Sequence, residues 1–514
     1  MTPRLRYPAP RAAAALLALA QAGCGPMTAG QTDSAQDSPA ETGFRFGDIT
    51  FQPCTLDSGT AQTTIDARCG VLEVAEDPAA ADGRTLNLNI AWLPATGASG
   101  GTDDPVFFFA GGPGQAATTL AWHINQSLRQ VRRQRDLILI DQRGTGSSNP
   151  LSCLDANGDT IPLDPEAMVS REAMLPYVQT CLASMEGRAD PRMYTTGHAI
   201  ADFNAVRQAL GVEQINLVGG SYGTRVAQQY AGAYPQHVRT MVIDGVAPND
   251  LVVGGEFDRT FDRALQIQSG YCEADPQCRE RFGGDLRTSL RALLETLRTA
   301  PVQVDFHHPR THEPQQDTIT ADTVTGLAFF FSYDPQTVSM LPLLLDEAAE
   351  GRYGPLMALS ALANDQMQDM LNRGMQWSVV CAEDAPRHVP DADADTILGP
   401  EAAEMLFNAC QVWPAGTPRA GYTELLQSDV PTLLLSGELD PVTPPEYAEQ
   451  VLPGLPNGRH LVLQGQSHGT LAVGCMPRLL GQFVESANAH DLDTTCLEDV
   501  RPVPPFTSFN GWEP

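Results

Sequence analysis

Residues 215–223 read INLVGGSYG, and this order is typical of a strand that turns sharply into a helix. Three of the first four residues are apolar, as expected of a strand buried on both faces of a parallel sheet. Ser221 has the spacing Gly-x-Ser-x-Gly, and the residues after it repeat apolar side chains at helical intervals. Glycines are needed beside so tight a turn, because a side chain there would crowd the backbone. The stretch predicts an α/β fold in which Ser221 is a nucleophile.

Five more short apolar runs are expected to join this strand in a mainly parallel sheet. Residues Leu86–Leu93 alternate apolar and polar side chains, which predicts an antiparallel strand at the start of the sheet. Helical patterns lie between the runs, so we expect crossover helices on the faces of the sheet. The five runs are Val106–Ala110, Leu137–Ile140, Thr240–Ile243, Thr432–Leu435 and Leu461–Leu463.

The pattern changes in the second half of the chain. Between about Val252 and Tyr422, amphipathic helical segments such as Asp285–Arg298 occur without strands. We interpret this region as a helical cap inserted into the α/β core. The expected parts are core residues 43–251, cap residues 252–422, core residues 423–490 and a C-terminal tail of residues 491–514.

A nucleophilic serine requires a general base and an acid that orients the base. In folds with this serine turn, the acid and then the histidine follow the serine along the chain. Asp440 and His468 each come after an apolar run, at strand ends where α/β sheets place their ligands. Both are therefore predicted to act with Ser221. Asp244, which follows the run ending at Ile243, and Glu438 are the alternative acids.

The same chemistry requires N–H groups that stabilise an oxyanion. One donor is expected to be the backbone N–H of Tyr222. The other is expected in residues 110–114, AGGPG, where Gly112 is favoured over Gly111 and the proline has no N–H. This stretch lacks the Gly-x-Gly-x-x-Gly spacing of dinucleotide-binding loops. Arg143, in the loop after the next strand, is predicted to pin loops rather than to contact substrate.

Together these stretches resemble the secreted tripeptidyl aminopeptidase and proline iminopeptidase group of α/β-hydrolases, over roughly residues 45–490. The resemblance implies an α/β-hydrolase fold and a serine exopeptidase acting on peptides with a free N-terminus. It makes Ser221, Asp440 and His468 the triad, with no metal or organic cofactor. Ala110 replaces the histidine usual in proline iminopeptidases, so release of one residue and of three both stay open. The motifs are FFFAGGPG, LILIDQRGTGSS, NLVGGSYGTR, GELDPVTPP and GQSHG.

An exopeptidase of this kind must hold the ammonium group of its substrate, for which a buried carboxylate is the natural partner. Glu383 is the favoured candidate and Asp384 the second, because the group often carries an acid near the end of the cap. An ordinary surface acid is the alternative in a chain with 62 acidic residues. A carboxylesterase with the same triad and an inactive hydrolase-like binding protein are the competing functions. The complete triad argues against the binding protein.

Composition excludes several other functions. The 514 residues carry a formal net charge of −30 and include no lysine. The missing basic surface argues against nucleic-acid binding. Without lysine, Schiff-base chemistry, phosphate-loop lysines and Ser-Lys dyads are excluded. The negative charge favours the approach of cationic peptide N-termini.

The first 24 residues are predicted to be an export signal, because arginines precede the short apolar run Ala12–Ala20 and small residues follow it. Cys24 resembles a bacterial lipoprotein acylation site, although Gln21 stands where leucine is usual. Ordinary signal-peptide cleavage nearby is the alternative. Residues 25–42 have the polar composition of a flexible tether. We expect a periplasmic or extracellular protein, either secreted freely or held to a membrane only by a lipid on Cys24.

The cysteines agree with export. Of 11 cysteines, ten remain when Cys24 is set aside, an even number that suits five disulfides in an oxidising compartment. No cysteine or histidine cluster has the spacing of a zinc site, and the stretch holding His307, His308 and His312 is interpreted as a solvated loop. The expected pairs are Cys54/Cys69, Cys153/Cys181, Cys272/Cys278, Cys381/Cys410 and Cys475/Cys496.

Overall fold

The computed structural model describes residues 43–57, 63–80, 82–98, 100–162, 171–391, 393–399 and 401–510. The predicted export signal with Cys24 and the predicted tether lie outside these residues.

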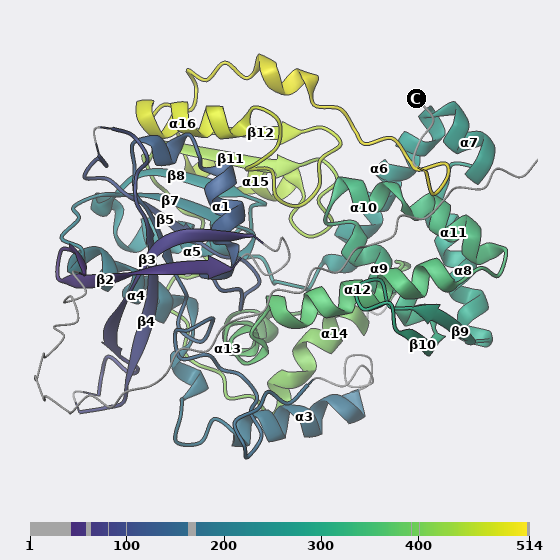
Figure 1. Cartoon of the computed structure of the whole chain (residues 1–514), viewed down its shortest axis with the longest axis horizontal. Helices are drawn as coiled ribbons and strands as arrows, with labels where there is room; N and C mark the ends of the chain where they lie inside the picture. Colours follow the sequence, from purple (N-terminus) through teal and green to yellow (C-terminus); the bar gives the residue numbers. More distant parts are fainter. Residues whose placement is uncertain are drawn as a thin grey trace, which may run out of the picture. The chain divides into compact units, whose positions relative to one another are not determined.

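Among the described residues, ten strands form one sheet (Figure 1) in the order β1-β2-β3-β4-β6-β5-β7-β8-β11-β12. Strands β1 to β4 pair antiparallel, β4 pairs antiparallel with β6, and the strands from β6 to β12 are parallel. The predicted strands are thus confirmed. The bounds are β1 (Phe44–Phe46), β2 (Ile49–Asp57), β3 (Thr64–Ala75), β4 (Thr85–Leu93), β5 (Val106–Phe109), β6 (Leu137–Ile140), β7 (Ile215–Gly220), β8 (Val238–Asp244), β11 (Thr432–Gly437) and β12 (Gly458–Leu463).

Helices cover both faces of the parallel strands, and successive side chains enter different apolar cores. Phe107 and Phe109 of β5 pack in the core that includes residues of α4 and α5. Val106 and Phe108 pack in the core that includes residues of α1 and α16. Burial on both faces explains why these strands read as continuous apolar runs. The helices of this part are α1 (Ala121–Ser127), α3 (Arg171–Ala183), α4 (Thr196–Ala209), α5 (Tyr222–Ala233), α15 (Pro445–Val451) and α16 (Met476–Ser486).

The predicted cap lies between β8 and β11 and has an apolar core of its own, which α6, α8, α9, α11 and α12 share. In the predicted amphipathic segment, the five leucines of α8 are buried on one face, and Asp285 caps the helix by accepting a hydrogen bond from Thr288 N–H at 3.3 Å. The cap helices (Figure 1) are α6 (Phe257–Ala274), α7 (Pro276–Phe282), α8 (Leu286–Thr299), α9 (Ala321–Phe331), α10 (Pro335–Ser339), α11 (Leu341–Ala349), α12 (Gly354–Met370), α13 (Arg373–Glu383) and α14 (Glu401–Phe407).

The expectation that the cap contains no strands is wrong. Strands β9 (Val302–His307) and β10 (Pro314–Ile319) pair antiparallel. In β9, Val304 and Phe306 are buried and the residues between and after them are exposed, so the strand has the alternation expected of a half-buried strand. The first four residues of β10 are exposed, and this strand has no apolar pattern.

The interpretation of the histidine stretch as a solvated loop is also wrong for two residues, because His307 ends strand β9 and His308 is not solvated. His308 is buried, and its Nε2 lies 3.2 Å from Asp365 Oδ2. Among the described residues, no group of three or more histidine, cysteine, aspartate or glutamate side chains is arranged to hold a metal ion.

The described part of the chain contains the five expected disulfides: Cys54–Cys69, Cys153–Cys181, Cys272–Cys278, Cys381–Cys410 and Cys475–Cys496. Each joins residues close in the sequence, and the separations range from 6 to 29 residues. Across the described ranges, no helix has the length and apolar character needed to cross a membrane.

Candidate active site

Ser221 occupies a strained turn between β7 and α5. Its backbone has φ 55° and ψ −126°, a conformation that L-residues rarely adopt and that is often kept at functional sites. A Cβ on Gly219 would overlap the carbonyl of Gly223, and a Cβ on Gly223 would overlap the carbonyl of Phe109. The two glycines are therefore required by close backbone contacts around the serine.

The end of β8 connects this turn with the loop that carries His468. The carbonyl of Asp244 accepts a hydrogen bond from Ser221 N–H at 2.9 Å. The Asp244 carboxylate accepts hydrogen bonds from the backbone N–H and hydroxyl of Thr470, at 2.6 and 2.8 Å, and from Leu471 N–H at 3.1 Å. One buried residue thus holds both the serine turn and the segment after His468.

Asp440 contacts the predicted base directly. Its Oδ2 lies 2.8 Å from His468 Nδ1, and its Oδ1 accepts hydrogen bonds from Val442 N–H at 2.9 Å and Thr443 N–H at 2.8 Å. The Thr443 hydroxyl donates to Asp440 Oδ2 at 2.9 Å and lies 3.2 Å from His468 Nδ1. The alternative acids bind elsewhere: Asp244 holds Thr470, and Glu438 accepts hydrogen bonds from the Tyr271 hydroxyl and Gly465 N–H.

The Asp440–His468 pair has the electrostatics of an oriented base. Burial alone would lower the pKa of His468, but the Asp440 charge and hydrogen bond raise it above its ordinary value. Burial alone would raise the pKa of Asp440, but His468 and the backbone N–H groups lower it. The pair therefore favours ionised Asp440 beside a histidine with increased proton affinity.

The expected oxyanion donors lie at the serine turn and at the loop after β5. Tyr222 is the first residue of α5, so its N–H has no acceptor within the helix. Gly111 N–H already donates to Gln115 Oε1 at 3.3 Å, an arrangement that favours Gly112 as the second donor. A cap segment adjoins this loop: Asn372 N–H donates to the carbonyl of Gly114 at 2.8 Å.

Arg143 is buried and fully engaged with the protein. Its Nε and Nη2 donate to the two carboxylate oxygens of Asp202, at 2.6 and 2.7 Å. Its Nη1 donates to the carbonyls of Glu76 and Met193, both at 2.8 Å. These bonds agree with the structural role expected of Arg143.

Glu383 and Asp384 are buried beside the same cation, Arg225, but they have different partners. Thr196 donates to Glu383 through its N–H at 2.7 Å and its hydroxyl at 2.8 Å. Asp384 accepts hydrogen bonds from Arg225 at 3.1 Å and from Arg387 and Val253 N–H at 3.2 Å. Burial raises the pKa of both acids, that of Glu383 to about 7 despite the nearby Arg225 charge.

Glu383 is also linked to the serine turn. The Thr196 hydroxyl lies 2.6 Å from the Tyr222 hydroxyl as well as 2.8 Å from Glu383. Asp384 is already bonded to two arginines. Glu383 therefore has the greater spare acceptor capacity of the two acids. Its side chain is 1% exposed, so a substrate group reaches it only when the surrounding segments separate.

Sequence reasoning missed three features of this site: Thr196, the anchoring role of Asp244, and Thr443. A local signal existed for Thr443, because an aspartate commonly accepts hydrogen bonds from the N–H groups two and three residues later. The contacts of Thr196 with Glu383 and of Asp244 with Thr470 span 187 residues or more, and no local pattern marks them.

Comparisons with known proteins show which hydrolases this chain is similar to. A family described as alpha/beta hydrolase fold matches residues 104–277, and one described as TAP-like protein matches residues 395–496. Serine protease Hip1 of Mycobacterium tuberculosis is 26% identical over 501 residues, covering 90% of this chain and 92% of that protein. Tripeptidyl aminopeptidase of Streptomyces lividans is 29% identical over 190 residues, covering 35% of each chain. Proline iminopeptidase of Neisseria gonorrhoeae is 27% identical over 143 residues, covering 28% and 32%.

The first prediction concerns the two buried acids near His468. Asp440→Asn should lower kcat/KM for a p-nitrophenyl ester by on the order of 10⁴-fold, because the base loses its orienting carboxylate. The acid limb of the residual activity should lie at lower pH than in wild type, because burial lowers the pKa of His468 and the Asp440 charge and hydrogen bond that oppose it are lost. Rate against pH for both proteins checks this.

Asp244→Asn is the matched control. It removes a buried carboxylate at an equivalent strand end but keeps an acceptor oxygen for Thr470. It should retain far more activity than Asp440→Asn. The reverse order would reassign the orienting acid to Asp244.

Proposed function

We propose that this chain, which belongs to the α/β-hydrolases of the tripeptidyl aminopeptidase and proline iminopeptidase group, is a serine exopeptidase releasing residues or short peptides from free N-termini. The observation that carries the proposal is the contact of His468 with the buried Asp440, 2.8 Å apart, while the loop of His468 is anchored through Asp244 to the turn of Ser221. Relatives named as peptidases support peptide substrates.

The mechanism is acyl transfer. His468, oriented by Asp440, takes the proton of the Ser221 hydroxyl as its oxygen attacks the scissile carbonyl carbon. The N–H groups of Tyr222 and Gly112 stabilise the oxyanion. His468 then gives its proton to the leaving amine, and an acyl-enzyme forms. Water, deprotonated by His468, hydrolyses this ester and restores Ser221.

We assign the substrate ammonium group to Glu383 rather than to Asp384. A carboxylate has about four acceptor positions, and Thr196 occupies two of those on Glu383. Asp384 is neutralised by Arg225 and Arg387, which leaves less attraction for another cation. The link from Glu383 through Thr196 to Tyr222 would bring a bound N-terminus close to Ser221.

A panel of p-nitroanilides tests the reaction and its step length. The substrates are Pro, Ala and Ala-Ala-Pro anilides with a free amine, their N-blocked forms and one p-nitrophenyl ester. We expect cleavage of free-amine anilides only, and loss of that cleavage in Ser221→Ala, because the acyl-enzyme needs the serine oxygen. The anilide that is cleaved gives the number of residues released.

Two results of the panel would contradict the exopeptidase. Ester turnover without anilide cleavage would show a carboxylesterase. Equal cleavage of blocked and free-amine anilides would show a serine peptidase that does not require a free N-terminus.

Glu383→Gln tests recognition of the ammonium group. We expect KM for the free-amine anilide to rise about 10- to 100-fold, because a charge-assisted hydrogen bond is lost, with ester turnover largely kept. In wild type, KM should fall as pH rises through about 7, where Glu383 ionises, and rise again near pH 8, where the substrate amine deprotonates. In Glu383→Gln, KM should not fall as the pH rises through about 7, because the group that ionises there is absent.

Asp384→Asn is the control for this change. It removes the adjacent acid, which pairs with Arg225 and Arg387, and should lower Tm without selectivity between amine and ester substrates. Loss of ester and anilide turnover to the same extent in Glu383→Gln would mean that Glu383 supports the structure only.

We also propose that the protein acts outside the cytoplasm, held to a membrane by lipid on Cys24. Five disulfides, formed in oxidising compartments, support export. Wild-type protein should appear in the membrane fraction with an acylated Cys24 at its N-terminus, and Cys24→Ser should be soluble. Cell fractionation and intact mass measure both. An unmodified N-terminus in the soluble fraction would show ordinary secretion.

A further inference from the structure

One turn of the cap contacts the loop of His468 in three ways. The turn, residues 332–334, connects α9 with α10. His468 N–H donates to the carbonyl of Tyr333 at 3.1 Å, and the Ser467 hydroxyl donates to the carbonyl of Ser332. The Tyr333 ring packs edge-on against the His468 imidazole, with ring centroids 5.2 Å apart and an interplanar angle of 79°. These three contacts have no role in the mechanism proposed above.

The turn itself is firmly held within the cap. The Ser332 hydroxyl donates to the carbonyl of Ala328 at 2.9 Å, and Asp334 caps α10 by accepting from Gln336 N–H at 2.8 Å. The Tyr333 ring also packs on Phe329 of α9, with centroids 5.5 Å apart. Phe329 packs in turn on Phe261 of α6 at 5.4 Å. A row of aromatic rings therefore runs from the cap core to the imidazole.

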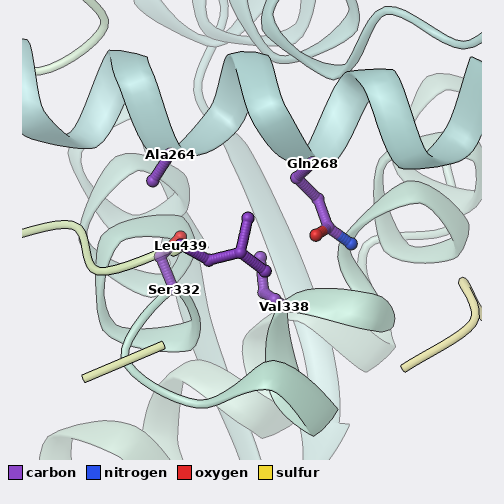
Figure 2. Close-up of a pocket in the computed structure, with 5 residues that line it drawn as sticks. All are labelled: Ala264, Gln268, Ser332, Val338 and Leu439. Carbon is purple, nitrogen blue, oxygen red and sulfur yellow. The ribbon is translucent and has the colours of Figure 1, made fainter. Parts of the chain in front are cut away.

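The space behind the turn is narrow. Figure 2 shows Ala264 and Gln268 of α6 on one side, facing Ser332, Val338 and Leu439. The cavity that these residues line is too small to admit a water molecule. Leu439 directly precedes Asp440, and its carbonyl lies 3.3 Å from the same Ser467 hydroxyl that binds Ser332. The cap turn, the histidine loop and the acid loop thus meet at the Ser467 hydroxyl.

We propose that the Ser332–Tyr333 turn is a positioning element for His468. The base is aligned only while this turn of the cap is packed against the loop of His468. Tyr333 is the positioning residue: its carbonyl fixes the backbone of His468 and its ring fixes the plane of the imidazole. The cap then controls the acid–base pair in addition to enclosing the substrate. This inference rests on the proposed role of His468 as the base.

A positioning role differs measurably from substrate binding and from general support of the fold. A misaligned base slows every reaction that needs an activated serine, including attack on a reagent too small to use the cap. Lost substrate contacts instead raise KM and leave such a reagent unaffected. General loosening of the cap lowers Tm for any comparable substitution in the cap core.

The experiment compares Tyr333→Leu, Tyr333→Phe and the control Tyr353→Leu. Tyr353 also packs against the cap core. Tyr353→Leu therefore removes a ring of the same size from the cap as Tyr333→Leu does. For each full-length protein we would measure Tm, kcat and KM for the best anilide, and the rate constant for phosphorylation of Ser221 by diisopropyl fluorophosphate.

Tyr333→Leu should lower kcat and the phosphorylation rate constant by the same factor, about 3- to 10-fold for one edge-to-face ring contact. KM should stay within about twofold, because ground-state binding is unchanged. Tyr333→Phe keeps the ring and should restore both rates. Tyr353→Leu should lower Tm and leave the phosphorylation rate constant at the wild-type value.

A second pair of variants tests the coupling through the turn. Ser467→Ala removes the hydroxyl that binds Ser332. Combined with Tyr333→Leu, its effect on the phosphorylation rate constant should be smaller than the product of the two single effects, because both act through one turn. Independent, multiplicative effects would overturn the proposal.

Three other results would also overturn it. These are an unchanged phosphorylation rate constant with raised KM in Tyr333→Leu, an equal rate loss in Tyr353→Leu, and failure of Tyr333→Phe to restore the rates. Failure of the proposed function looks different, because wild-type protein would then not react at Ser221, or His468→Ala would react as fast as wild type.

Discussion

The hydrogen bonds of Asp244 are the constraint on which the rest of the site depends. Its carbonyl holds the serine turn and its carboxylate holds the segment after His468. A buried carboxylate is costly unless it is well bonded, and burial alone raises the pKa of Asp244, whereas bonds from Thr470 and Leu471 act to lower it. The cost of this burial is therefore offset only when the turn and the histidine loop occupy one relative position.

Elements whose causes are local were predictable from the sequence. The parallel strands are buried on both faces and therefore appear as apolar runs, and Gly219 and Gly223 mark a turn in which a larger residue would overlap the backbone. Asp440 and His468 could be chosen because strand ends meet at one edge of a parallel sheet. The disulfides were also predictable, since each joins cysteines close in the sequence.

Features that depend on distant partners were not predictable. Glu383 and Asp384 are adjacent and look alike in the sequence, yet one accepts from Thr196 and the other from Arg225. Tyr333 has no local mark, because its partner follows 135 residues later. Strand β10 begins with four exposed residues, and only its pairing with β9 makes it a strand. Tertiary contacts decide all three cases, and a single sequence does not display them.

The disulfides of the described residues have a further consequence. Cys272–Cys278 and Cys381–Cys410 lie within the cap, Cys54–Cys69 and Cys153–Cys181 lie within the core, and Cys475–Cys496 joins the core to the C-terminal tail. None of the five joins the cap to the core. Disulfide formation therefore stiffens each part without linking the cap covalently to the core. The described contacts between cap and core are noncovalent, as is the hydrogen bond between Tyr333 and His468. Reduction of these disulfides would thus loosen each part without directly breaking the contact of Tyr333 with His468.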